Sequence, residues 1–214
     1  EPSELISTIN TSVNVSCNGG NDGQATVSTS GGTVPYSYLW SSGGTNVTDS
    51  NVIAGTYTVA TTDILGCTDL DTIVITEPLG PLTATTSSVD NLCFGDNTGN
   101  GIVTAIGGTA PYTYFWNSIP SVNDSVNGLL IGTYLVTVTD TLGCTVTDSI
   151  VLNEPTLLTI SFSQTNVSCN GGNDGEAIVT PIGGTTPYSY VWNSGDLDSI
   201  AESLTTGGYT LIVT

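Results

Sequence analysis

The chain has 214 residues, of which 19 are Asp or Glu and none is Lys, Arg or His, so its formal net charge at pH 7 is −19. Nucleic-acid binding is excluded because no side chain can neutralise phosphates, and sites built on a P-loop lysine or a histidine base are excluded with it. The 60 Ser and Thr residues and 26 Gly residues are typical of strands and turns. Hydrophobic residues make up 38% of the chain and alternate with polar ones, which predicts a folded, all-β protein.

Six segments of alternating polarity predict strands in the first 78 residues, separated by turns rich in Gly and Asn. They span residues 5–15, 24–30, 35–41, 46–53, 56–62 and 68–76. Short strands at this density, without a helical period, predict a small β-sandwich of immunoglobulin-like kind. No segment resembles a signal peptide or a membrane span. Because the chain opens at Glu1 without Met, we expect a piece of a longer protein.

Three motifs recur along the chain at a nearly constant spacing. C-N-G-G-N-D-G at residues 17–23 returns in altered form at 93–99 and unchanged at 169–175, a spacing of 76 residues. G-G-T-x-P-Y-x-Y-x-W and G-T-Y-x-V-x-x-T-D-x-L-G-C recur with spacings of 76 and 77 residues. We expect tandem sandwiches arranged end to end, the third of which stops before its last strand and takes that strand from further chain or from a neighbour. The expected domains span residues 1–78, 79–155 and 156–214.

The cysteines are predicted to staple each sandwich, because a domain of about 76 residues has a small core. Cys17 is expected to pair with Cys67, and Cys93 with Cys144. Cys169 is the first cysteine of the third repeat, so its partner is expected beyond the end of the chain. The alternative, a thiolate metal site, lacks histidine and any C-x-x-C spacing. Disulfides indicate an oxidising, extracellular location.

An aromatic row recurs on one face of a predicted strand in every repeat. Such a row has two interpretations: a tryptophan in the sandwich core, which we favour, or a face that stacks on sugar rings and binds glycans through three linked copies. The row comprises Tyr36, Tyr38 and Trp40, then Tyr112, Tyr114 and Trp116, then Tyr188, Tyr190 and Trp192.

Acidic residues in the turns suggest a calcium site as a weaker hypothesis. Asp22 and Asp174 lie in the N-D-G loops, and Asp63, Asp69 and Asp71 are expected nearby. Oxygen-rich loops suit Ca²⁺, which takes six to eight oxygen ligands. The alternative is a tight turn in which Gly and Asn adopt positive φ, and the full ligand set does not recur in the second repeat. No cofactor is therefore assigned.

Taken together, the three motifs and the Glu-Pro that closes each repeat resemble the SprB repeat of surface proteins from gliding and related Bacteroidota. The resemblance covers essentially the whole chain. It implies a segment of a giant cell-surface adhesin or filament that is secreted through the type IX system. It also implies an extracellular location at the cell surface.

Asp-Ser/Thr-aliphatic triplets look like the O-glycosylation signal of Bacteroidota, which makes their hydroxyls candidate sugar attachment points. The alternative is that strand alternation in a chain rich in Asp and Thr produces such triplets often. The candidate residues are Thr72, Ser125, Thr141, Ser149 and Ser199.

The expected function is a non-enzymatic, stiff stalk for attachment, gliding or cell–cell contact. Catalysis is not expected, because the carboxylates are scattered over turns and strand ends in every repeat. The expected partners are further copies of the repeat along the chain, lateral copies in a homo-oligomeric filament, and a cell-surface or polysaccharide receptor. No nucleic acid or membrane insertion is expected. The alternatives are a glycan-binding module that uses the aromatic faces, and a spacer in a secreted hydrolase.

Overall fold

The computed structural model describes residues 3–214, which form seventeen strands, β1–β17, and no helix. No helix that could span a bilayer is therefore found in this part of the chain. The all-β prediction is confirmed. One compact unit runs to Thr86 and adds Val103–Asp124 and Leu135–Ser149, and a second unit holds the remaining residues. This division passes through the second repeat, so the domain boundaries expected at 78/79 and 155/156 stay a prediction.

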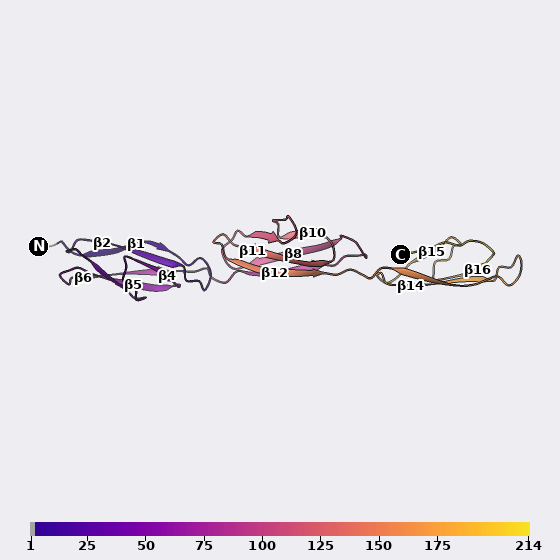
Figure 1. Ribbon diagram of the computed structural model, residues 1–214, viewed down its shortest axis with the longest axis horizontal. Helices are drawn as coiled ribbons and strands as arrows, with labels where there is room; N and C mark the ends of the chain where they lie inside the picture. Colours follow the sequence, from indigo (N-terminus) through magenta and orange to yellow (C-terminus); the bar gives the residue numbers. More distant parts are fainter. Residues whose placement is uncertain (1–2) are drawn as a thin grey trace. The chain divides into compact units, whose positions relative to one another are not determined.

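The first repeat is a sandwich of two three-stranded sheets, and its six predicted strands are confirmed (Figure 1). One sheet has the order β1-β2-β4 and the other the order β3-β5-β6, with antiparallel pairing throughout. Polar and apolar residues alternate along these strands, so one face of each sheet is turned inward. The strands are β1 (Ile6–Val13), β2 (Gly23–Ser30), β3 (Ser37–Trp40), β4 (Thr48–Val52), β5 (Gly55–Thr62) and β6 (Thr68–Ile75).

β1, β3, β4 and β6 run in the same direction, and β2 and β5 run in the opposite one. β2 is antiparallel to β1 and β4, and β5 is antiparallel to β3 and β6. β1 and β6 are parallel neighbours: the Ser7 N–H donates to Asp69 at one end, and the Val15 N–H donates to the Thr76 carbonyl at the other. A chain segment after β1 and a segment before β6 therefore lie at opposite ends of the sandwich.

β3 and β4 together make a single pass along the sandwich. β3 ends at Trp40, which pairs with Val59 in the middle of β5. The chain then changes sheet, and β4 ends at Val52, which pairs with Gly23 at the beginning of β2. Two predicted strands thus cover the length that one longer strand covers elsewhere in the repeat.

The core of the first repeat lies between the two sheets. Trp40, Val27, Val59 and Ile75 are each at most 2% exposed and belong to one buried cluster. Ile75 closes the cluster from the last strand, because its Cγ2 atom lies 2.8 Å from the position that a Cβ on Gly23 would take. The last strand is therefore part of the core.

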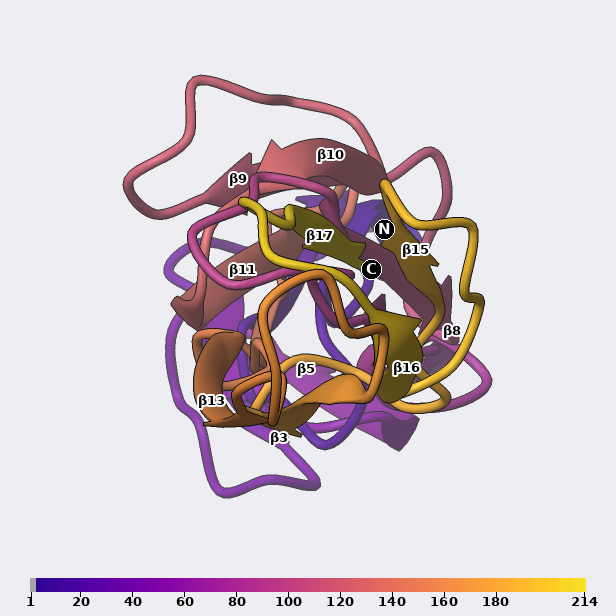
Figure 2. The same ribbon diagram turned by 90° about the vertical axis from the view of Figure 1, so that its right-hand side faces the viewer.

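The second and third repeats reuse these sheets. The second has sheets β10-β8-β7 and β12-β11-β9, and the third has β13-β14-β16 and the two-stranded β15-β17. In Figure 2, β15 and β17 lie on one side of the third repeat, and β13 and β16 lie on the other. The strands are β7 (Thr83–Val89), β8 (Gly99–Ile106), β9 (Thr113–Trp116), β10 (Ser125–Leu129), β11 (Gly132–Thr139), β12 (Thr145–Leu152), β13 (Thr159–Thr165), β14 (Gly175–Ile182), β15 (Tyr190–Trp192), β16 (Ile200–Leu204) and β17 (Leu211–Val213).

Within residues 3–214, the third repeat has no counterpart of β6 and β12. Val136 and Val138 of β11 are fully buried, whereas their counterparts Leu211 and Val213 of β17 are half-buried. A groove of about 670 Å³ lies at this place, lined by residues that include Gly175, the counterpart of Gly23. The groove thus lies at the position in the third repeat that corresponds to that of Ile75 in the first repeat.

The G-G-T-x-P-Y motif forms the turn that joins the two sheets. Gly31 has φ +70°, and a Cβ on it would lie 1.8 Å from the carbonyl oxygen of Glu4, so only glycine fits. The Tyr36 hydroxyl donates to the Gly31 carbonyl at 2.6 Å and holds the turn closed. The peptide bond before the proline of this motif is cis in all three repeats.

Candidate functional site

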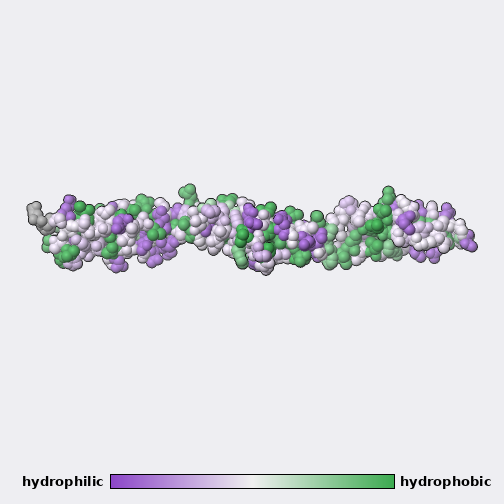
Figure 3. Space-filling model, turned by 90° about the horizontal axis from the view of Figure 1, so that it is seen from above, coloured by the Kyte–Doolittle hydropathy of each residue, from purple (hydrophilic) through white to green (hydrophobic). Residues whose placement is uncertain are grey.

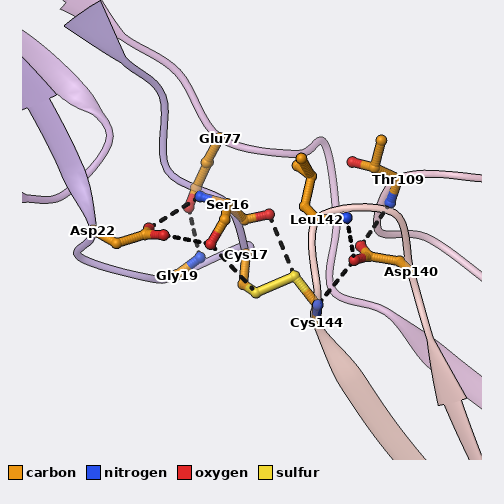
Figure 4. Close-up of a disulfide and its surroundings, with 9 residues drawn as sticks. All are labelled: Ser16, Cys17, Gly19, Asp22, Glu77, Thr109, Asp140, Leu142 and Cys144. Carbon is orange, nitrogen blue, oxygen red and sulfur yellow. Dashed lines mark hydrogen bonds between the residues drawn. A yellow bond between two sulfur atoms is a disulfide. The ribbon is translucent and has the colours of Figure 1, made fainter.

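A disulfide joins the first repeat to the second. Cys17 is bonded to Cys144, with their Cα atoms 5.8 Å apart and a separation of 127 in the sequence (Figure 4). Cys17 follows β1 of the first repeat, and Cys144 precedes β12 of the second. The other three cysteines of the described chain, Cys67, Cys93 and Cys169, are free and exposed. The predicted pairs Cys17–Cys67 and Cys93–Cys144 are therefore wrong.

The direction of the last strand explains this correction. Cys67 lies just before β6, whereas the loop of Cys17 lies beside Glu77, two residues after the end of β6, because the Gly19 N–H donates to Glu77 Oε2 at 2.5 Å. The chain from Cys67 to Glu77 spans roughly 30 Å at the rise of an extended strand. A disulfide needs Cα atoms within about 7 Å of each other. The two cysteines of one sandwich therefore cannot meet.

The second repeat has the same geometry. The Gly95 N–H, two residues after Cys93, donates to Glu154 Oε2 at 2.8 Å, beyond the end of β12. Cys144 lies at the beginning of that strand. Each of the first two repeats therefore carries one cysteine at each end, and this placement allows bonds between repeats.

The C-N-G-G-N-D-G loop that carries Cys17 is held by carboxylates. Asp22 accepts hydrogen bonds from the Ser16 N–H at 3.0 Å and from the Ser16 hydroxyl. The hydroxyl and then the N–H lower the pKa of Asp22 below its ordinary value. In the second repeat Thr98 takes the place of Asp22, and its hydroxyl accepts from the Leu92 N–H at 3.0 Å. A neutral hydroxyl thus accepts the equivalent backbone hydrogen bond, which favours the turn interpretation over a calcium ligand.

The turn that carries Cys144 is built around Asp140, which is buried. Its Oδ1 accepts from the N–H groups of Leu142 and Cys144 at 3.0 and 2.9 Å, and its Oδ2 accepts from the Thr109 N–H at 2.9 Å (Figure 4). Desolvation raises the pKa of Asp140, but the backbone donors outweigh it, so the net pKa is lowered. The carboxylate thereby fixes the backbone of a disulfide cysteine.

Sequence reasoning did not identify Glu77 and Asp140 as residues that hold the junction. Their recurrence could have pointed to them, because Glu precedes Pro at the end of each complete repeat and Asp stands four residues before Cys67 and Cys144. Asp63 repeats the contacts of Asp140 by accepting from the N–H groups of Thr33, Leu65 and Cys67.

The carboxylates of the calcium hypothesis do not converge. Asp69 Oδ2 accepts from the Ser7 N–H at 2.6 Å and Asp71 Oδ2 accepts from the Ile9 N–H at 2.6 Å, so both cap the edge of β1. Asp22 lies at the opposite end of the sandwich, beside Ser16. Among residues 3–214, no three Cys, Asp or Glu side chains are grouped in a way that would hold a metal ion. The geometry therefore does not support a calcium site.

The tryptophans of the aromatic rows are core residues. Trp40, Trp116 and Trp192 are 1%, 0% and 4% exposed. Each indole N–H donates to a backbone carbonyl, so its polar edge is also occupied. These acceptors are the carbonyls of Asn46, Asn123 and Asp198. The favoured core interpretation is confirmed, and the glycan-binding alternative loses its stacking platform.

A model of the SprB repeat matches the chain three times, at residues 9–45, 85–120 and 161–197, together just over half of its length. The chain belongs to the SprB-repeat family. Each matched SprB segment extends from the first strand of a repeat past the core tryptophan. The T-D-x-x-G-C turn lies outside the matched residues, although its Cys144 forms the disulfide and its Asp140 accepts a hydrogen bond from the Cys144 N–H. No curated protein matches the sequence.

Solved structures that resemble this SprB chain share little sequence with it. A structure described as the basis for Dscam isoform specificity is 14% identical, with a TM-score of 0.28, over 97% of this chain and 69% of the other. The N-terminal eight Ig domains of Down Syndrome Cell Adhesion Molecule are 13% identical, with a TM-score of 0.27, over 99% and 35%. A tetra-tandem repeat in the extending region of a large adhesion protein is 15% identical, with a TM-score of 0.26, over 98% and 65%. The chain thus spans about a third to two thirds of these structures.

The candidate O-glycosylation residues of the SprB chain differ in exposure. Thr72, Thr141 and Ser149 are exposed, whereas Ser125 and Ser199 are half-buried. The third residue of a triplet is buried where the strand turns it inward, as at Val126 and Ile150, because neighbouring side chains on a strand face opposite sides. Glycosylation at these positions stays a prediction.

The first testable prediction concerns Asp140 of the junction. Asp140→Asn is expected to lower the melting temperature of the second SprB repeat at pH 7 by roughly 5–10 °C, because an amide cannot accept from all three backbone donors. The wild-type advantage should be full above the unfolded Asp pKa of about 3.9 and vanish as the pH falls through the lower folded pKa. Circular-dichroism melts between pH 2.5 and 7 measure this, with exposed Asp124→Asn as the control. A difference that did not change with pH would contradict the prediction.

Proposed function

We propose that this SprB-repeat chain is a non-enzymatic structural segment of an extracellular adhesin or cell-surface filament. Its role is that of a stiff stalk in attachment, gliding or cell–cell contact. The observation that carries the proposal is the Cys17–Cys144 disulfide between successive repeats. A bond of this kind persists in oxidising surroundings outside the cell and limits how far two domains can separate.

The contacts made by the residues that recur between repeats support a structural role. Asp22, Glu77 and Asp140 hold backbone N–H groups around the disulfide (Figure 4). The tryptophans fill cores. The residues that recur between repeats are thus committed to folding and to the junction, which disfavours both an enzyme and the glycan-binding alternative.

The composition suits an exposed stalk. A chain without Lys or Arg offers no cleavage site to trypsin-like proteases, and a net charge of −19 keeps neighbouring copies soluble. Further repeats along the chain are the partners that this role requires, and lateral copies in a filament and a receptor are further proposed partners. The β1 edge is capped by Asp69 and Asp71, which disfavours strand addition there. On the face shown in Figure 3, hydrophobic residues gather right of the centre, and polar and hydrophobic residues are interspersed elsewhere.

Immuno-electron microscopy of intact source cells tests the proposal. Antibodies raised against the 214-residue chain should label fibres outside the cell body, and the width of the fibres separates single chains from lateral bundles. Treatment with EDTA should leave the fibres intact, because the carboxylates at the junction bind backbone groups. Label confined to the cytoplasm would contradict the proposal. Loss of the fibres in EDTA would show that a metal ion holds them together and would contradict the assignment of these carboxylates to backbone groups alone.

A further inference from the structure

We propose that the Cys17–Cys144 disulfide is a tension bypass: it carries load from the first strand of one repeat directly to the last strand of the next. The residues between the two cysteines are then shielded from extension. This inference deepens the proposed stalk function and rests on it for its biological meaning, although the bypass itself is a property of the covalent connections.

The entry side of the bypass is a single extended strand. Load applied before β1 passes along Ile6–Val13, which spans the sandwich, and reaches Cys17 four residues later. An extended strand already rises about 3.3 Å per residue, close to the limit of a polypeptide. This segment therefore gains little length under tension.

The exit side has the same form. Cys144 immediately precedes β12 (Thr145–Leu152), so load that crosses the disulfide continues along one strand through the second repeat. β2–β6 and β7–β11 lie in the covalent loop closed by the disulfide. They support the load-bearing strands by pairing with them and are not themselves pulled apart.

Without the disulfide the load path changes. Tension would enter the first repeat at β1 and leave it after β6, two parallel neighbours in one sandwich. Such a pull slides the strands past each other and opens the repeat. The 127-residue separation would release about 430 Å of chain at full extension, whereas the bond holds the two Cα atoms 5.8 Å apart.

The ends of the bypass are built into the repeat. Asp174 accepts from the Ser168 N–H at 3.0 Å beside Cys169, as Asp22 does beside Cys17, and Asp63 accepts from the Cys67 N–H at 2.9 Å, as Asp140 does from Cys144. In any longer array of these repeats, the first cysteine of one repeat would bond to the second cysteine of the next. Cys93 would then bond to the second cysteine of the third repeat, and Cys67 to the first cysteine of a preceding repeat. The expected partner of Cys169 would be the second cysteine of a following repeat.

Single-molecule stretching of the whole chain between handles on its two termini tests the bypass. The oxidised wild type should unfold without releasing the segment between the cysteines. Reduction of the folded wild type, or Cys17→Ser, should add about 430 Å of contour length. Cys67→Ser is the matched control and should behave like the oxidised wild type.

Each outcome is decisive. Equal contour lengths before and after reduction would overturn the bypass. A gain of only about 170 Å on reduction, the length of the 50-residue separation between Cys17 and Cys67, would show pairing within one repeat and overturn it too. Because reduction acts on the folded wild type, the test holds even where Cys17→Ser fails to fold. A failure here leaves the surface location to be judged by the antibody labelling.

Discussion

Replacing Trp116 with alanine is expected to lower the free energy of unfolding of the second repeat by roughly 3–5 kcal/mol, the cost of removing a large buried aromatic side chain. Trp116 is 0% exposed, and its indole N–H donates to the Asn123 carbonyl at 3.0 Å. The substitution leaves a cavity and also removes the hydrogen-bond donor of the Asn123 carbonyl. Small domains are stable by only about 5–15 kcal/mol, so the second repeat should be partly or wholly unfolded at 37 °C.

Phe115→Ala is the matched control, because Phe115 is the neighbouring residue on β9 and is 64% exposed. Its substitution should change the free energy of unfolding by no more than about 0.5 kcal/mol. Urea unfolding followed by far-ultraviolet circular dichroism measures both variants. Equal stabilities for the two variants would show that the indole is not a core residue and would return the glycan-binding face to consideration.

The strands and the core tryptophans were predictable because their signal is local. Alternation along Ser37–Trp40 places Tyr38 and Trp40 on one face, and the scarcity of other large side chains directs that face inward. The fold class follows from the same pattern repeated three times. Each of these inferences needs only neighbouring residues and the two-residue period of a strand.

The disulfide pairing was not predictable in this way, because it depends on which end of the sandwich each turn occupies. A count of strands treats β3 and β4 as two passes, which puts Cys17 and Cys67 at the same end. In the structure these strands make one pass, so the count is wrong by one and the cysteines lie at opposite ends. Pairing within a repeat was the simplest assumption. It was wrong because the chain changes sheet between Trp40 and Thr48 and continues in the same direction.

The choice between the two interpretations of the acidic residues, calcium ligand or turn, could not be made from the sequence for a related reason. Asp22 and Asp63 are both oxygen ligands by chemistry, but the topology separates them and gives each a set of backbone N–H donors. A carboxylate in a turn has two uses, as a metal ligand or as a cap for backbone donors, and composition alone does not distinguish them. The substitution of Thr98 for Asp22 in the second repeat was the available clue, because a cap tolerates a hydroxyl.

The second large effect is expected from completing the third repeat. A copy of residues 140–155 appended directly after Thr214, the counterpart of Thr139, supplies the turn and last strand that the second repeat has. The copies of Ile150 and Leu152 should fill the groove of about 670 Å³ beside Trp192. Their burial is worth about 1.5–3 kcal/mol each, so after the cost of ordering the new strand we expect the third repeat to gain roughly 2–5 kcal/mol.

The same graft tests the pairing rule, because it carries a copy of Cys144. That cysteine should bond to Cys93, as Cys144 bonds to Cys17, and mass spectrometry of the non-reduced protein after digestion identifies the pair. A control graft in which serine replaces the copies of Ile150 and Leu152 keeps the length and the cysteine but removes the apolar burial. If both grafts were equally stabilising, the groove would not be the seat of a strand. If the appended cysteine bonded to Cys169 instead, the sandwich would be stapled within one repeat, and the route of the chain inferred from β3 and β4 would be incorrect.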